Sequence, residues 1–267
     1  MLARLKTGAC SVVLLCVLTA VQVGAAENTA QEVPPFDPRA DQVLKDTQAY
    51  MSSLKEMKLH VEGMLDVVSP EEEVFTYTTQ VDIAMKRPDK MYVKRVGVMR
   101  NQEIFYNGSE LVLHSLQHKV YAKADNVPDT IDKMMDYAMA ELGLQSPGSD
   151  LLYNDMYNGL MSSAVSGAYL GTVIVDGVEC HHLAYRGENV DFQLWVEAGE
   201  QAKPKRFMIV SKKLPQAPRY QLMVKSLEPA TLSDTMFTFV PSGDEKRIRF
   251  LTEQEIKQLK KAVKESK

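Results

Sequence analysis

Residues 57–86 read MKLHVEGMLDVVSPEEEVFTYTTQVDIAMK and carry the most regular pattern in the chain. In both halves of this stretch apolar residues alternate with polar ones, which is the period of a β-strand with one buried face. Ser69-Pro70 between the halves has the composition of a turn. We therefore expect two paired antiparallel strands with a shared apolar face, which carries Met57, Leu59, Val61, Leu65, Val67, Phe75, Tyr77, Val81, Ile83 and Met85.

Further strand patterns follow on the C-terminal side of this pair. Pro88 ends the second strand, and Asn107-Gly108 predicts a tight hairpin because both residues tolerate a positive φ. Asp176-Gly177 is another compact-turn pair. The connections are short enough to favour antiparallel neighbours, so the sequence predicts about ten strands in one sheet. The additional strands are expected at residues 91–99, 103–106, 111–115, 120–122, 172–175, 178–185, 190–196, 206–212 and 220–227.

Two segments have helical spacing instead. In the first, Asp37 is expected as N-cap and Pro38 at the first helical position, followed by an amphipathic helix to Leu54. The second opens at Pro128-Asp129 and ends near Gly143. Its apolar face carries Met134, Met135 and Met139, which suit either packing on the sheet or an adaptable binding surface. Residues 147–168 are expected to be less regular, with a weak helix near 151–157 and a Ser/Gly-rich loop after it.

The two ends of the chain have different compositions. Residues 1–25 begin with Arg4 and Lys6, continue with a short apolar run and end in small residues, as a secretory signal peptide cleaved near Ala25 does. A lipidated or uncleaved anchor is the alternative. Residues 26–36 are expected as a tether, residues 37–250 as one domain and residues 251–267 as an amphipathic helix. This Lys-rich helix is either solvated or in contact with a membrane surface or an envelope protein.

Composition excludes some classes of function. The formal charge is −4, and loss of Arg4 and Lys6 with the signal peptide would make it −6, so nucleic acid is not an expected partner. Cys180 would then be the one remaining cysteine, and we expect it to be a buried apolar residue. No nucleophile elbow, dinucleotide fingerprint, phosphate loop or zinc helix is present, and Cys180-His181-His182 places His181 on the opposite strand face. We expect no enzyme activity, metal or cofactor.

Two sets of strand and turn motifs resemble known families. Residues 87–93, 104–108, 111–113 and 119–121 follow the order seen in periplasmic lipoprotein carriers of the LolA/LolB type. Residues 175–183 and 191–196 more closely resemble an uncharacterised family of predicted periplasmic proteins in the same superfamily. The resemblance covers residues 37–241. It rests on strand and turn signatures, not on a set of catalytic or metal-binding residues.

The resemblance implies an α+β fold: a strongly curved antiparallel sheet, or incomplete β-barrel, whose concave apolar face is covered by helices and can hold acyl chains. One position departs from the carriers. They have a strand arginine after the proline that helps to control lipoprotein release, whereas Tyr92 stands at the matching place here, with Lys94 and Arg95 nearby. This departure argues against shuttling by that mechanism and leaves lipid binding less affected.

The sequence thus favours a periplasmic, non-enzymatic carrier for a lipid, a lipoprotein acyl chain or another apolar ligand. The ligand is expected between the sheet and the methionine-rich helix. A structural or protein-interaction module of the envelope, with its concavity filled by its own helices, is the alternative. The residues expected at the ligand are Phe75, Tyr77, Val81, Ile83, Met85, Met91, Met134, Met135 and Met139.

Overall fold

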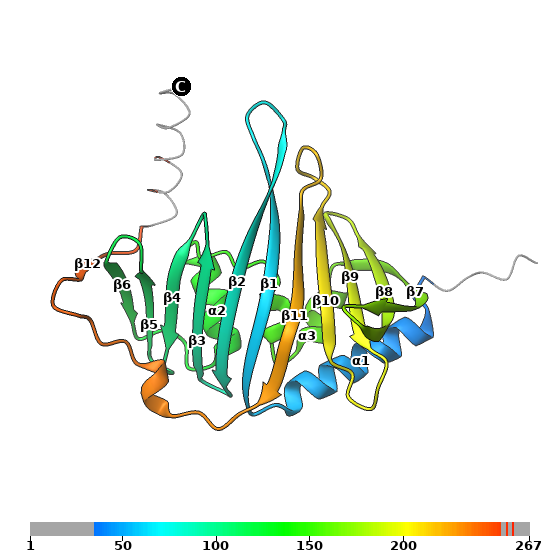
Figure 1. The fold of residues 1–267 in the computed structure, drawn as a ribbon, viewed down its shortest axis with the longest axis horizontal. Coiled ribbons are helices and arrows are strands. Elements are labelled where there is room, and N and C mark those ends of the chain that lie inside the picture. The colour runs from blue at the N-terminus through cyan, green and yellow to red at the C-terminus, as the bar shows by residue number, and fades with distance from the viewer. Residues whose placement is uncertain (1–34, 252–254, 256–257, 259–267) are drawn as a thin grey trace, which may run out of the picture. The chain divides into compact units, whose positions relative to one another are not determined.

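A computed structural model describes residues 35–251, together with residues 255 and 258. One sheet of twelve strands runs through this part of the chain, in the order β12-β6-β5-β4-β3-β2-β1-β11-β10-β9-β8-β7 (Figure 1). The strands are β1 (Glu56–Val68), β2 (Val74–Lys86), β3 (Lys90–Gly97), β4 (Asn101–Tyr106), β5 (Glu110–Ser115), β6 (Val120–Asp125), β7 (Ala164–Val175), β8 (Val178–Gly187), β9 (Val190–Glu197), β10 (Pro204–Ser211), β11 (Arg219–Pro229) and β12 (Lys246–Ile248). The helical segments are α1 (Pro38–Ser53), α2 (Ile131–Ala140), η1 (Ser149–Leu152), α3 (Met156–Met161) and η2 (Asp234–Phe237).

The strands form two antiparallel meanders that join in the middle of the sheet. β1 to β6 make the first meander and β7 to β11 the second, and the pairing of β1 with β11 connects them. β12 pairs with β6 in parallel, which corrects the expectation that all neighbours are antiparallel. The turn predicted at Asn107-Gly108 connects β4 to β5, and Gly108 has a φ of 95°.

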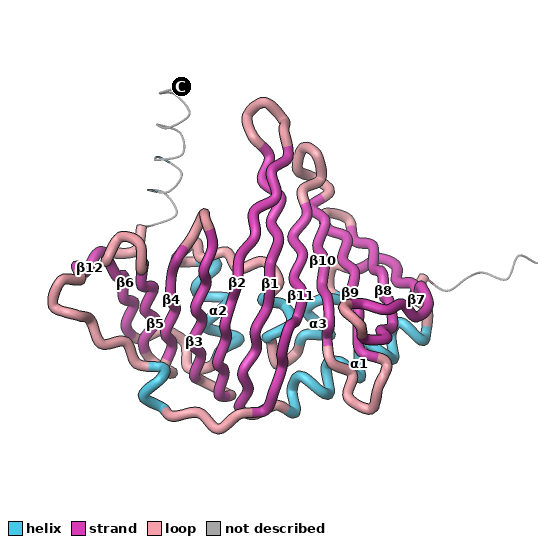
Figure 2. The backbone as a smooth tube through the Cα atoms, viewed as in Figure 1, coloured by secondary structure: helices cyan, strands magenta, loops and turns pink. Residues whose placement is uncertain are grey.

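The period-two pattern of residues 57–86 determines which face of the sheet is covered. Met57, Leu59 and Val61 of β1 are buried, and they pair with Met85, Ile83 and Val81 of β2 on the same face. The three helices α1, α2 and α3 all lie on one side of the sheet (Figure 2). This arrangement confirms the α+β fold with helices over the apolar face.

The sheet is strongly curved and open. Leu111 of β5 and Pro204 of β10 line the same cavity, although five strands separate β5 from β10. In a flat sheet these two strands would lie about 29 Å apart, at roughly 4.8 Å per strand. The intervening strands must therefore bend around the cavity. β12 and β7 remain as the two edges, so among the described residues the sheet does not close into a barrel.

The helices begin where capping predicts. Asp37 caps α1 by accepting a hydrogen bond from the Arg39 N–H at 2.8 Å, and Pro38 occupies the first turn, as expected from the sequence. The α2 N-cap is Thr130, two residues after the predicted start at Pro128. α1 packs on β7, β8 and α3. α2 is held on the other half of the sheet, where the Ile131 N–H donates to the Pro88 carbonyl at 2.8 Å.

The segment between α2 and β8 is more ordered than predicted. The weak helix expected near residues 151–157 is two short helical segments, η1 and α3. The Ser/Gly-rich loop expected after it is wrong, because β7 already begins at Ala164. Position 167 of β7 is a glycine because the Tyr185 ring packs directly against the backbone there. A Cβ at this position would be 2.6 Å from Cε1 of that ring.

Residues 230–248 cover part of the opposite, convex face. Leu232 and Phe237 are buried against Ala84 of β2. The imidazole of His114 lies between two carboxylates, 3.0 Å from Glu103 and 2.7 Å from Glu245. The signal peptide, the domain boundary expected at residue 25 and nearly all of the C-terminal helix lie outside the described residues, except that Glu255 and Gln258 are helical. The boundary expected at residue 36 falls directly before Asp37, the N-cap of α1.

The contact of α1 with the core supports a test of the fold. Leu44 is fully buried on α1, so we expect Leu44→Ala to lower the free energy of unfolding by about 2–5 kcal/mol through lost packing and a new cavity. Ala49→Ser on the exposed side of the same helix should change it by no more than about 0.5 kcal/mol. Urea denaturation followed by circular dichroism measures both; equal effects would contradict the packing of α1.

Candidate functional site

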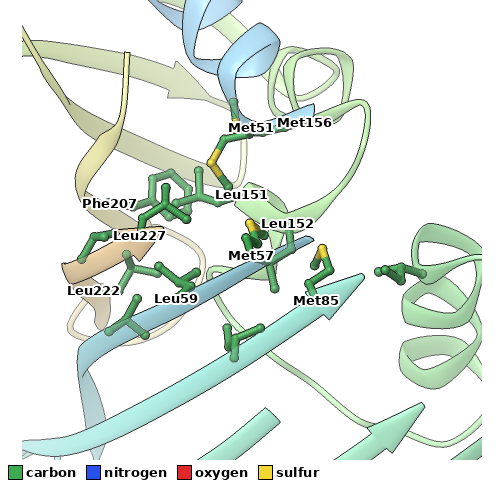
Figure 3. Close-up of a cluster of buried hydrophobic side chains, with 14 of the residues drawn as sticks. Met51, Met57, Leu59, Met85, Leu151, Leu152, Met156, Phe207, Leu222 and Leu227 are labelled. Carbon is green, nitrogen blue, oxygen red and sulfur yellow. The ribbon is translucent and has the colours of Figure 1, made fainter. Parts of the chain in front are cut away.

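A cavity of about 700 Å³ lies between the concave face of the sheet and the helices. Its floor is formed by side chains of β1, β2 and β3, and its roof by α2, η1 and α3. Figure 3 shows Met51 and Met156 on the helical side and Leu59 and Leu222 on the sheet, and all four residues line the cavity. The wall is mainly apolar, with Leu59, Val61, Val81, Ile83, Met91, Val93, Ile104, Met134, Met135, Met139, Leu160, Leu222 and Val224.

The cavity exists because the helices cover the two halves of the sheet separately. α1 lies over β7 and β8, whereas α2 is anchored beside β3 through Pro88. Between them, among the described residues, the concave face is crossed by the loop of residues 144–148 and by the short segments η1 and α3. A six-residue helix and a single 3₁₀ turn present few side chains, so the middle of the sheet is incompletely filled.

Six of the nine residues expected at the ligand line this cavity: Val81, Ile83 and Met91 from the sheet, and Met134, Met135 and Met139 from α2. Met134 is buried, while Met139 is 57% exposed at the edge of the space. The structure thus brings the methionines of one helix face opposite the apolar residues of two strands. The role of these residues in ligand binding remains a prediction.

The structure places Phe75, Tyr77 and Met85 elsewhere. Met85 is fully buried in packed core. Phe75 is 49% exposed, because β2 is paired with β3 only from Thr79 onward and β1 with β11 only up to Leu65. Beyond these points the β1–β2 hairpin projects past its neighbours (Figure 1). The alternation of the two strand faces was predicted correctly. The tip of the hairpin, with Phe75, extends beyond the part of the sheet that the helices cover.

Polar residues at one end of the cavity were missed by the sequence analysis. Arg95 and Gln102 are paired across β3 and β4, and Arg100, Ser146 and Tyr220 also line this end. The Arg95 guanidinium donates from Nη2 to the Ser146 hydroxyl at 3.2 Å. One signal could have identified Arg95: it follows Met91 and Val93 at period two, where an apolar residue is expected.

Burial alters the acid–base properties of this end. It lowers the pKa of the Arg95 guanidinium, with a further lowering from the nearby charge of Arg100. It raises the pKa of the Tyr220 hydroxyl, which the positive charge of Arg95 partly opposes. Burial also raises the pKa of the Asp150 carboxyl group, which lines the same cavity. Desolvation therefore disfavours the charged forms of both groups, although Asp150 as a whole residue is exposed to solvent.

The other candidates from the sequence are used in packing. Cys180 is fully buried, and burial raises the pKa of its thiol to about 11, so it behaves as an apolar residue. The His182 ring stacks on Trp195, with 4.2 Å between ring centroids. In the described part of the chain, no three His, Cys, Asp or Glu side chains are grouped as a metal site would require. None of the helices described there is both long and apolar enough to span a bilayer.

The family model for predicted periplasmic proteins named DUF2092 matches residues 40–251, which include almost all of the described sheet and every residue at the cavity. The chain belongs to this DUF2092 family. The match confirms the family predicted from the sequence and agrees with the periplasmic location expected from the N-terminal segment. No curated protein matches the chain.

Several solved structures are similar to this DUF2092 protein at low identity. An uncharacterized conserved protein from Thermus thermophilus is 12% identical, with 79% of this chain and 99% of that chain covered and a TM-score of 0.46. The lipoprotein LppX of Mycobacterium tuberculosis is 12% identical, with 74% and 100% covered and a TM-score of 0.46. A LolA superfamily protein from Nitrosomonas europaea is 13% identical, with 75% and 97% covered and a TM-score of 0.35.

The position of Asp150 predicts a pH-dependent stability effect. Its pKa is raised in the folded protein above the usual 3.8, so the folded state binds more protons than the unfolded state between the two values, and stability falls as the pH rises through them. Asp150→Asn should therefore be more stable than the parent protein at pH 7, and this difference should disappear below pH 3.8. Thermal unfolding between about pH 3 and 8 measures it.

Asp46→Asn is the matched control, because Asp46 lies on the exposed side of α1. It should show no such pH-dependent gain. A loss of stability in Asp150→Asn at pH 7 would contradict the raised pKa of this carboxyl group.

Proposed function

We propose that this protein is a non-enzymatic periplasmic carrier that binds one lipid-like apolar ligand between the curved sheet and α2. The observation that supports this most directly is the cavity of about 700 Å³ with its apolar wall. Cavities of roughly 300–1,000 Å³ are typical of small-molecule sites. The space is therefore large enough for an acyl chain or a molecule of similar volume.

The energetics of such a ligand are favourable. Each CH₂ group transferred from water to an apolar wall contributes roughly 0.8 kcal/mol, so a chain of ten such groups supplies about 8 kcal/mol before the cost of ordering it. Met134, Met135 and Met139 present unbranched, polarizable side chains to the space. Such side chains adapt to ligands of varied shape. This favours a carrier for a class of apolar molecules over a site for one rigid compound.

The cavity favours a carrier over the other functions considered from the sequence. An envelope scaffold with a self-filled concavity gives no reason for a hollow lined by Leu59, Val81 and Met91. Catalysis would require a nucleophile or base beside a partner that orients it. At this cavity no histidine or cysteine is present among the described lining residues.

Uptake of apolar compounds is the first test. The protein purified from the periplasm should carry lipid that native mass spectrometry detects as a mass addition, which denaturation releases. After delipidation it should bind the fluorescent apolar probe N-phenyl-1-naphthylamine with one site per chain. Absence of both bound lipid and probe uptake would contradict the carrier function.

Met135 provides a test of the site. Met135→Gln has nearly the same volume and places an amide against the apolar wall, where an unpaired polar group costs about 1–3 kcal/mol. We expect probe affinity to fall about tenfold while the circular dichroism spectrum is unchanged. Met99→Gln is the matched control, because Met99 is 53% exposed and does not line the cavity. Equal probe affinity in both variants would show that the ligand binds elsewhere.

A further inference from the structure

Two arginine side chains with free hydrogen-bond donors line one end of the cavity. Arg95 has one hydrogen bond, from Nη2 to the Ser146 hydroxyl, and its buried Nε–H has no acceptor among the described residues. Arg100 makes no hydrogen bond or ion pair within the described residues. A guanidinium group has five donors, so most of the donors at this end are available to a ligand.

The register of the sheet explains why Arg95 faces the cavity. Arg95 pairs with Val81 of β2, whose side chain lines the same space, and with Gln102 of β4 on its other side. Residues paired directly across neighbouring strands point to the same face. The arginine is therefore held on the concave face by the backbone, with Gln102 beside it.

A glycine lets Tyr220 reach toward the same place from β11. A methyl group at Gly63 of β1 would lie 3.2 Å from the Tyr220 hydroxyl oxygen, so the absent side chain leaves space for this group. The hydroxyl has no hydrogen-bond partner among the described residues, and the charge of Arg95 acts on it. Tyr220 thus adds another free donor near Arg95.

The charges at this end are not neutralised within the described protein. No salt bridge joins Arg95 or Arg100 to a carboxylate there, although Asp136 and Asp150 line the same cavity. The nearby charge of Arg100 further disfavours the charge of Arg95. The buried Nε–H of Arg95 is unfavourable without an acceptor, whereas an anion that accepts hydrogen bonds from a guanidinium is bound strongly.

We propose that Arg95, together with Arg100 and Tyr220, binds the anionic group of an amphiphile, a phosphate or a carboxylate, whose hydrocarbon part fills the apolar cavity. This inference rests on the proposed carrier function and names the class of its ligand. The protein would bind one anionic lipid molecule in preference to a neutral one. The arginines position the polar end of the ligand, and the methionine face of α2 covers its chain.

The test compares three probes by displacement of N-phenyl-1-naphthylamine: dodecyl phosphate, dodecanol and inorganic phosphate. The delipidated protein should bind dodecyl phosphate about tenfold or more tightly than dodecanol, since a charge-assisted hydrogen bond contributes at least that factor. Inorganic phosphate alone should not compete. Preference for the anion with competition by inorganic phosphate would contradict the lipid class and indicate a site for free phosphate.

Variants separate the anionic site from the apolar one. Arg95→Gln should abolish the preference for dodecyl phosphate by lowering the affinity for this probe, and Arg95→Lys should restore part of the preference. Arg247→Gln on β12 removes the same charge at an exposed position outside the cavity and should keep the full preference. A preference that persists in Arg95→Gln, or equal binding of the two probes by the parent protein, overturns this inference but not the carrier function. Binding of neither probe overturns both.

Discussion

Coverage of the concave face of the sheet is the constraint on which the rest of this structure depends. A strongly bent sheet turns its apolar side chains toward a common interior, and water must be kept from them by other elements. Here α1 and α2 cover the two halves, and in the described part of the chain the loop of residues 144–148 and the short segments η1 and α3 cross between them. The hollow over β1, β2 and β3 follows from this incomplete coverage, not from any special feature of the strands.

The two faces of the sheet differ in how completely other parts of the chain pack against them. On the convex side, residues 230–248 pack Leu232 and Phe237 onto Ala84, and all three side chains are buried. On the concave side, the residues at the centre of the sheet face unfilled space. Interiors of proteins are normally close-packed, and a large apolar void forfeits dispersion contacts. A ligand that fills the space would restore those contacts, which connects the architecture to the proposed function.

Much of the fold could be predicted because period and turn chemistry are local signals. The alternation in residues 57–86 gave the correct faces of β1 and β2, and Asn107-Gly108 gave the β4–β5 turn. The start of β7 was missed because glycine lowers strand propensity at position 167. Glycine is needed there because the Tyr185 ring packs against the backbone, and Tyr185 is eighteen residues away in sequence. For the site, period predicts the face of a residue but not where neighbouring strands end, so Val81 and Ile83 were placed at the cavity together with Phe75 and Tyr77. Arg95 and Tyr220 come close only through register and the gap at Gly63, which no local pattern encodes.

The central claim is that an apolar molecule occupies the space between α2 and the sheet. A crystal structure of the delipidated protein soaked with a bromine-labelled dodecanol tests it most directly, because the anomalous signal of bromine locates the chain without assumptions about its fit. The account predicts a bromine peak within the volume bounded by Val81, Met91 and Met134. Bromine peaks confined to the outer surface, or a cavity that closes by movement of α2 onto the strands, would contradict it.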